Sequence, residues 1–95
     1  MFERILKRMR EKVRTRQYLM TLHAEEEMND DGLTIYDVES GILTGEILER
    51  QKDRMTAEWK YHIRGETVDG GEVEMIAKLS PTGKPVIITV YVPGE

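Results

Sequence analysis

The period of the hydrophobic pattern changes at Gly45, and this change restricts the fold more than any other feature of the sequence. Before Gly45, apolar residues recur mostly at the spacing of amphipathic helices, and after it they alternate with a period of two, as in half-buried strands. Helical segments followed by a run of strands predict an α+β fold. With 95 residues, we expect one domain over residues 1–95.

The segment 1–16 is predicted to be a basic amphipathic helix. It holds seven Lys or Arg residues against Glu3 and Glu11, so its net charge of +5 contrasts with −9 for residues 17–95. Its apolar residues share one helical stripe: Phe2, Ile5, Leu6, Met9 and Val13. We expect this stripe to dock on a sheet and the charges to face solvent. Contact with RNA, an acidic partner or a membrane surface is the alternative.

Residues 17–31 predict an early strand and a short helix. The strand spans Gln17–Leu22, and the helix spans His23–Asp31 with Thr21 as its N-cap. Gly32 is expected to end this helix in the left-handed conformation.

A second short helix is predicted over Thr34–Leu43. Thr34 and Asp37 have the three-residue spacing of a capping box. Gly41 lies inside this helix at a cost of about 1 kcal/mol relative to Ala. We therefore expect Gly41 to pack closely against another element.

The remaining residues predict a four-stranded antiparallel meander. Asp69-Gly70-Gly71 is a strong hairpin signal between the second and third of these strands. The last strand is apolar at almost every position and is expected to be central. The four strands are expected around Ile47 and Leu48, and over Glu58–Thr67, Glu72–Leu79 and Pro85–Val92.

The best chemical signal lies on the Glu58–Thr67 strand, because alternation sends Lys60, His62 and Arg64 to one face. Lys78 and Tyr91 join this face if the registers of the neighbouring strands allow it. Such a site suits a phosphodiester, since cations stabilise the developing charge while His62 moves a proton. The alternative is an ordinary polar strand face that faces solvent.

His23 is the second candidate for chemistry. In the first turn of a helix the dipole disfavours added positive charge, so we expect a neutral imidazole near pH 7. It is either a structural histidine bonded to a carboxylate or carbonyl, or a general acid/base, or a metal ligand together with Glu27 at i+4. No further metal ligands are apparent, so neither a metal nor a cofactor is expected.

Composition excludes several classes of protein. The chain has no cysteine, which rules out a disulfide scaffold, a thiolate zinc site and a cysteine nucleophile. No segment has the length and apolarity of a signal peptide or a membrane span, so a cytoplasmic protein is expected. A domain of this size gains stability from association, and a homodimer or a complex is a further expectation.

Several short motifs occur along the chain: Thr21-Leu22-His23-Ala24, Glu27-Met28, Asp31-Gly32-Leu33-Thr34, Asp37-Val38, Gly45-Glu46-Ile47 and Ile87-Ile88-Thr89-Val90-Tyr91. Together these motifs resemble a bacterial domain family of unknown function with the pattern T-x-H-A-x-x-R-M-x-x-R-G-I-S. The resemblance covers about residues 17–92.

Such domains resemble the RelE and MqsR group of toxins, which cleave mRNA and are often encoded beside a small antitoxin-like protein with a CxxC zinc finger. The resemblance implies a RelE-like fold, a toxin role and an antitoxin-like partner. Glu27 and Asp31 stand where the family pattern has arginines. Arginines there would bind RNA phosphates, whereas carboxylates repel them.

Two hypotheses follow. The first is a metal-independent endoribonuclease in which His62 or His23 is the general base, Tyr91 completes the catalytic group, and three cations hold the phosphate: Lys60, Arg64 and Lys78. The second is a non-catalytic module of the same fold that binds a partner protein through its sheet or its basic helix. RNA and an antitoxin-like protein are the expected partners, and neither direct DNA binding nor a membrane is expected.

Overall fold

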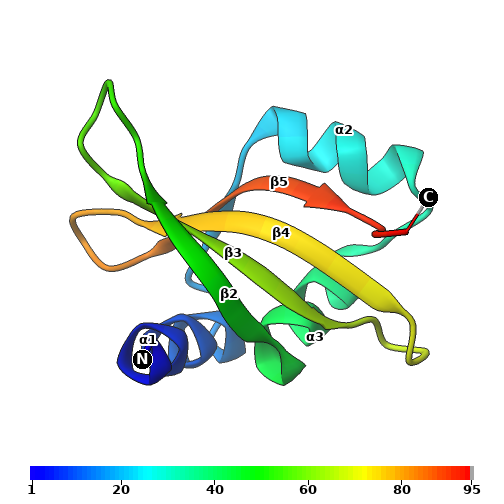
Figure 1. The fold of residues 1–95 in the computed structure, drawn as a ribbon. Helices are drawn as coiled ribbons and strands as arrows, with labels where there is room; N and C mark the ends of the chain where they lie inside the picture. The colour runs from blue at the N-terminus through cyan, green and yellow to red at the C-terminus, as the bar shows by residue number, and fades with distance from the viewer. Residues whose placement is uncertain (95) are drawn as a thin grey trace.

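The computed structural model describes residues 1–94, which form three helices and five strands in an α+β fold, as the pattern predicts. The order along the chain is α1 (Glu3–Arg14), β1 (Leu19–Met20), α2 (Leu22–Asp30), α3 (Ile35–Thr44), β2 (Glu46–Lys52), β3 (Trp59–Glu66), β4 (Glu72–Leu79) and β5 (Pro85–Tyr91). In Figure 1, α2 runs beside β5, while α1 and α3 lie below the strands. Within the described residues, no helix is long and apolar enough to cross a bilayer.

One mostly antiparallel sheet contains all five strands, in the order β1-β5-β4-β3-β2. Strands β2 to β5 pair with their sequence neighbours in antiparallel fashion. The early strand β1 is parallel to β5, through the pairs Leu19↔Val86 and Met20↔Ile87. The edge strand beside β5 is therefore only two residues long.

The predicted strand Gln17–Leu22 is wrong in its extent, because β1 holds only Leu19 and Met20. The chain is still turning after α1: Arg16 has a φ of 57°, and the Gln17 N–H bonds back to the Lys12 carbonyl oxygen at 2.8 Å. At the other end, Thr21 already serves as the N-cap of α2. The two helices therefore shorten the strand from both sides.

The local helix signals are confirmed. The Thr21 side chain accepts a hydrogen bond from the Ala24 N–H, and Gly32 has a φ of 71°. Thr34 and Asp37 form a capping box on α3. Both helices start one residue away from the predicted position, Leu22 in place of His23 and Ile35 in place of Thr34.

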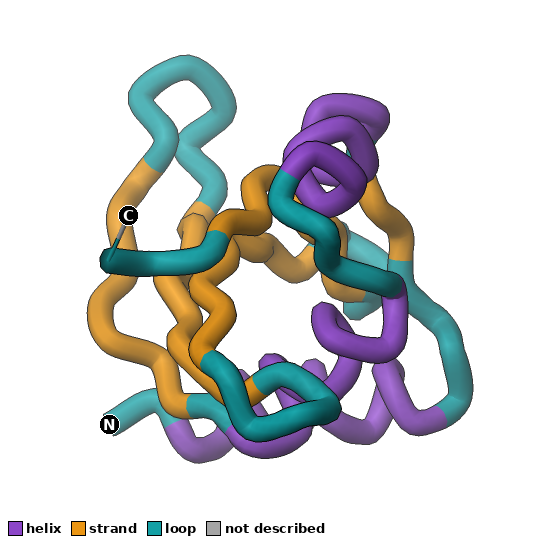
Figure 2. Tube along the Cα trace, turned by 90° about the vertical axis from the view of Figure 1, so that its right-hand side faces the viewer, coloured by secondary structure: helices purple, strands orange, loops and turns teal. Residues whose placement is uncertain are grey.

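The three helices contribute to a core on one face of the sheet (Figure 2). The apolar stripe of α1 docks there as predicted, with Met9 and Val13 buried. The other members of the buried cluster are Ala24 of α2, Val38 and Ile42 of α3, and Tyr61, Ile63, Val73, Met75, Ala77, Ile87 and Val90 of the strands.

Helix α3 approaches β3 backbone to backbone. A Cβ atom added to Gly65 would overlap the main-chain carbonyl group of Gly41. A Cβ atom on Gly41 would lie 2.7 Å from both Met75 Cε and Val73 Cγ1. The close packing predicted for Gly41 is confirmed, and it sets the distance between the helix and the strand that carries His62.

Candidate functional site

Three side chains from three neighbouring strands meet on the sheet face opposite the core. His62 lies on β3, Glu74 on β4 and Tyr91 on β5. His62 Nε2 is 2.5 Å from Glu74 Oε1, and the Tyr91 hydroxyl donates to the same oxygen at 2.9 Å. The Tyr91 oxygen is also 3.0 Å from His62 Nε2. We refer to these residues as the His62–Glu74–Tyr91 cluster.

A β-bulge in β5 brings Tyr91 to the face of His62 and Glu74. In β5, the extra residue is Ile88, since Ile87 pairs with Ala77 and Thr89 pairs with Ile76. Tyr91 then lies opposite Glu74. Bulges shift the alternation of a strand by one residue, and they are common next to functional sites because they re-aim side chains.

Glu74 is the buried acceptor of the cluster, with 8% of its side chain exposed. Burial raises the pKa of this carboxyl, but hydrogen bonds from Tyr91 and His62 and the charges of His62 and Arg64 outweigh burial, so the pKa lies below its usual value. Glu74 is therefore ionised near neutral pH. Arg64 Nε lies 3.5 Å from its second oxygen.

Tyr91 is held in its protonated form. Burial raises the pKa of its phenol, and the hydrogen bond and negative charge of Glu74 raise it further. The phenol is therefore a proton donor in the cluster at neutral pH.

The contact with Glu74 orients the imidazole of His62. If Nε2 carries the hydrogen that faces Glu74, then Nδ1 presents its lone pair, which is how a buried carboxylate prepares a histidine as a general base. Nδ1 lies 3.9 Å from Oε1 of the half-exposed Glu49. A second bulge, at Leu48 of β2, places Glu49 opposite His62.

The predicted phosphate ligands share the face of the cluster, but each lies against a carboxylate. Lys60 and Lys78 are direct neighbours across β3 and β4. Lys60 Nζ is 2.9 Å from Asp53 Oδ2, and Lys78 Nζ is 3.0 Å from Glu58 Oε1. These ion pairs offset the repulsion between two like charges on adjacent strands.

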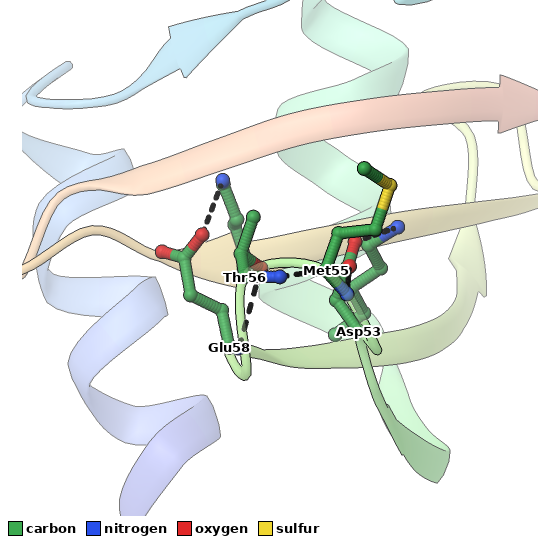
Figure 3. Close-up of polar contacts among 6 residues, drawn as sticks. Asp53, Met55, Thr56 and Glu58 are labelled. Atoms are coloured by element: carbon green, nitrogen blue, oxygen red, sulfur yellow. Dashed lines mark hydrogen bonds and ion pairs between the residues drawn. The ribbon is translucent and has the colours of Figure 1, made fainter.

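The carboxylates that pair with the lysines come from the hairpin between β2 and β3 (Figure 3). Asp53 Oδ1 also accepts hydrogen bonds from the main-chain N–H groups of Met55 and Thr56. The Lys60 hydrogen bond and these two main-chain donors lower the pKa of Asp53 to about 2. The hydrogen bond from Lys78 lowers the pKa of Glu58. Both carboxylates therefore remain charged at any physiological pH.

His23 belongs to a different group of contacts. Its Nε2 lies 3.2 Å from Glu27 Oε1, and the same carboxylate oxygen accepts from the Val90 N–H at 3.3 Å. Asp31 Oδ2 accepts from the Val92 N–H at 3.1 Å. Glu27 and Asp31 stand at the arginine positions of the family pattern. Their carboxylates thus accept hydrogen bonds from main-chain N–H groups of β5 and the residue after it, beyond the end of β1.

His23 and His62 have no direct bond. Across residues 1–94, no hydrogen bond or ion pair joins the two imidazoles, and no group of three or more His, Asp or Glu side chains is arranged to hold a metal ion. The cluster around His62 is therefore the one that combines a titratable base, an orienting carboxylate and a proton donor.

Glu74 and Glu49 were missed in the sequence. The position of Glu74 could have been predicted from the sequence. A turn at Asp69-Gly70-Gly71 fixes the register between β3 and β4, and this register sets Glu74 opposite Arg64. The position of Glu49 could not, because it depends on the bulge at Leu48.

The fold and the cluster define a small α+β domain with a polar, histidine-containing sheet face. Residues 20–92 match the model of a family described as a domain of unknown function, DUF4258, and the chain belongs to that family. No curated protein and no solved structure matches the chain. Helix α1 lies before the matched segment.

Proposed function

We propose that this protein is a toxin-like endoribonuclease that cleaves mRNA without a metal ion. The observation that carries the proposal is the contact of His62 with the buried, ionised Glu74 beside the protonated Tyr91. The resemblance to the RelE and MqsR toxins supports the same reaction and extends the proposal to a RelE-like fold. An antitoxin-like protein encoded beside it is the proposed partner.

The proposed reaction is an internal transesterification. Nδ1 of His62 takes the proton of a ribose 2′-hydroxyl, and the 2′-oxygen attacks the adjacent phosphorus. The bond from phosphorus to the 5′-oxygen breaks, and this oxygen takes a proton from Tyr91. The products are a 2′,3′-cyclic phosphate and a 5′-hydroxyl, and solvent returns the proton from His62 to Tyr91.

Arg64 is the proposed ligand for the non-bridging phosphate oxygens. It lies at the edge of the cluster, and about half of its side chain is exposed. Lys60 and Lys78 are the further ligands in this proposal. Their carboxylate partners, Asp53 and Glu58, would have to release them as the phosphate enters.

Cleavage of a labelled mRNA fragment, with and without ribosomes, tests the proposal. We expect His62→Asn and Tyr91→Phe to lower the cleavage rate by about 10²-fold or more, as for other general acid–base residues. Arg54→Gln, a change of an exposed hairpin cation outside the cluster, is the matched control and should cleave normally. Intact RNA under both conditions with the wild-type protein would exclude the proposal.

The ion pairs of Lys60 and Lys78 favour a second candidate, a non-catalytic module that binds a partner protein. A cation that already pairs with a carboxylate attracts RNA weakly. Binding is favoured because free Lys and Arg side chains neutralise phosphates and release the counterions of the RNA. This candidate predicts a stable complex with the product of an adjacent gene, or a homodimer, together with no RNA cleavage. Co-purification and light scattering would detect either assembly.

A further inference from the structure

The outward side of α1 carries cations that have no role in the cluster. Arg4, Lys7, Arg8 and Arg14 are exposed, and among residues 1–94 none of them lies within 4.0 Å of a carboxylate oxygen. Residues three, four and seven apart share one broad side of a helix. The row extends over about 15 Å of helix axis. We call these four residues the α1 basic row.

Two carboxylates lie on α1 near this row. Glu3 is engaged by the amino-terminal ammonium group at 2.9 Å. Glu11 is exposed within the row. The row therefore keeps an excess of positive charge, in a chain with a net charge of −4.

The fold fixes which side of α1 faces solvent. Leu6, Met9 and Val13 are buried on its inner side. Arg10, also on the inner side, donates from Nη2 to the Gly45 carbonyl oxygen at 2.8 Å and from Nε to that of Ile42 at 3.3 Å. The helix cannot rotate without breaking these bonds, so the α1 basic row is presented to solvent as a preformed surface.

Several cations elsewhere on the sheet are already engaged. Lys60, Lys78 and Arg64 contact carboxylates. Arg50 and Lys52 lie over the ring of Trp59, at 4.1 and 5.8 Å from its centroid. These contacts engage five cations of the sheet, whereas the four cations of the α1 basic row make no ion pair among residues 1–94.

We propose that the α1 basic row binds the sugar–phosphate backbone of RNA. Three of its four cations are arginines, whose planar guanidinium groups match phosphate oxygens in pairs. A membrane surface fits less well, because helices that lie in a bilayer interface insert their apolar face, and the apolar face of α1 is buried in the core. The surface lies outside the matched family domain, and the inference does not rest on the proposed cleavage.

Fluorescence anisotropy with a labelled, unstructured RNA of about 20 nucleotides tests this surface. The full chain is titrated at KCl concentrations from about 50 to about 200 mM. The double variant Lys7→Gln/Arg8→Gln is compared with Lys52→Gln/Arg54→Gln, which removes the same charge from the end of β2 and the hairpin that follows it. All measurements are made in the His62→Asn background, so that binding is recorded whether or not the protein cleaves RNA.

We expect the wild-type surface to bind RNA with an affinity that falls steeply with salt. Loss of two phosphate contacts should weaken binding by roughly tenfold and reduce the slope of log K against log[salt] by about 1.4. The Lys52/Arg54 variant should change neither value appreciably. Equal losses in the two double variants, or binding that does not depend on salt, would overturn the proposal.

Two competitors separate RNA from other anions. Polyglutamate and vesicles containing phosphatidylserine are added as competitors at the same total concentration of negative charge as the RNA. If either one binds as tightly as RNA and is equally sensitive to Lys7→Gln/Arg8→Gln, the assignment to RNA is wrong. Binding of RNA by the His62→Asn protein, together with intact RNA after incubation with the wild-type protein, would support the α1 surface and exclude the endoribonuclease, so the two proposals fail separately.

Discussion

The carboxylate of Glu27 accepts a hydrogen bond from the main-chain N–H of Val90, 63 residues further along the chain and 3.3 Å away. Asp31 does the same for Val92 at 3.1 Å. Strand β1 pairs with β5 only at Val86 and Ile87, so these later N–H groups have no partner strand on that side. The side chains of Glu27 on α2 and of Asp31, the C-cap of α2, supply the acceptors that a longer β1 would have supplied.

Replacing Glu27 by the arginine of the family pattern should therefore destabilise this protein. Glu27→Arg removes the acceptor of a partly buried N–H group and should lower the free energy of unfolding by about 1–3 kcal/mol. Urea denaturation measures the change. Glu26→Arg, one residue away and exposed, is the control and should change stability by less than about 0.5 kcal/mol. Similar losses in both variants would show that the charge, and not the hydrogen bond, is responsible.

The cluster should make stability depend on pH through Glu74. Its pKa is lowered in the folded protein, so its ionised form contributes stability above the unfolded value of about 4.5, and this contribution is lost as the pH falls through the lower folded pKa. Glu74→Gln should be less stable than the wild type near pH 6, and the difference should shrink as the pH approaches 3. Denaturation at several pH values tests this, and a difference that stays constant would contradict it.

The two glycines between α3 and β3 should respond differently to alanine. At Gly41 the added methyl group meets the ends of two side chains, Met75 and Val73. Overpacking there should cost about 1–3 kcal/mol, offset in part by the helix propensity of alanine, worth about 1 kcal/mol.

At Gly65 the methyl group meets the main chain of Gly41, which cannot move aside without displacing α3. Gly65→Ala should therefore be the more destabilising of the two variants, and it should prevent stable folding. Thermal melts followed by circular dichroism compare them. A milder effect at Gly65 than at Gly41 would contradict the backbone contact.

Freeing Lys60 should strengthen RNA binding. Asp53→Asn removes the charge of its partner, 2.9 Å away, while the amide oxygen can still accept from Met55 and Thr56. One additional free cation at the site should steepen the salt dependence of RNA binding by about 0.7. Anisotropy titrations measure the slope, and Asp69→Asn, which removes a charge from the turn between β3 and β4, should leave it unchanged.

Local rules predicted the helix ends well. Thr21, Gly32 and the pair Thr34 and Asp37 act through neighbours within four residues, so their roles can be read from spacing alone. The shared face of Lys60, His62 and Arg64 follows from alternation within one strand. These features need no knowledge of tertiary contacts.

The partners of these residues could not be predicted in the same way. The bulges at Leu48 and Ile88 change the alternation without a sequence signal, and they determine that Glu49 and Tyr91 share a face with His62. The parallel pairing of β1 with β5 and the bonds from α2 to Val90 and Val92 join segments more than 60 residues apart. Which of the possible long-range contacts form depends on the whole fold, so spacing along the sequence does not predict them.

The contact between Gly41 and Gly65 ties the cluster to a helix that contributes no side chain to it. His62 lies three residues before Gly65 on the same strand, and the absence of side chains at both glycines leaves no compressible layer between helix and strand. A change in the position of α3 must therefore be transmitted directly to the strand of His62. The position of α3 therefore helps to fix the strand that carries the imidazole, in addition to the contact of His62 with Glu74.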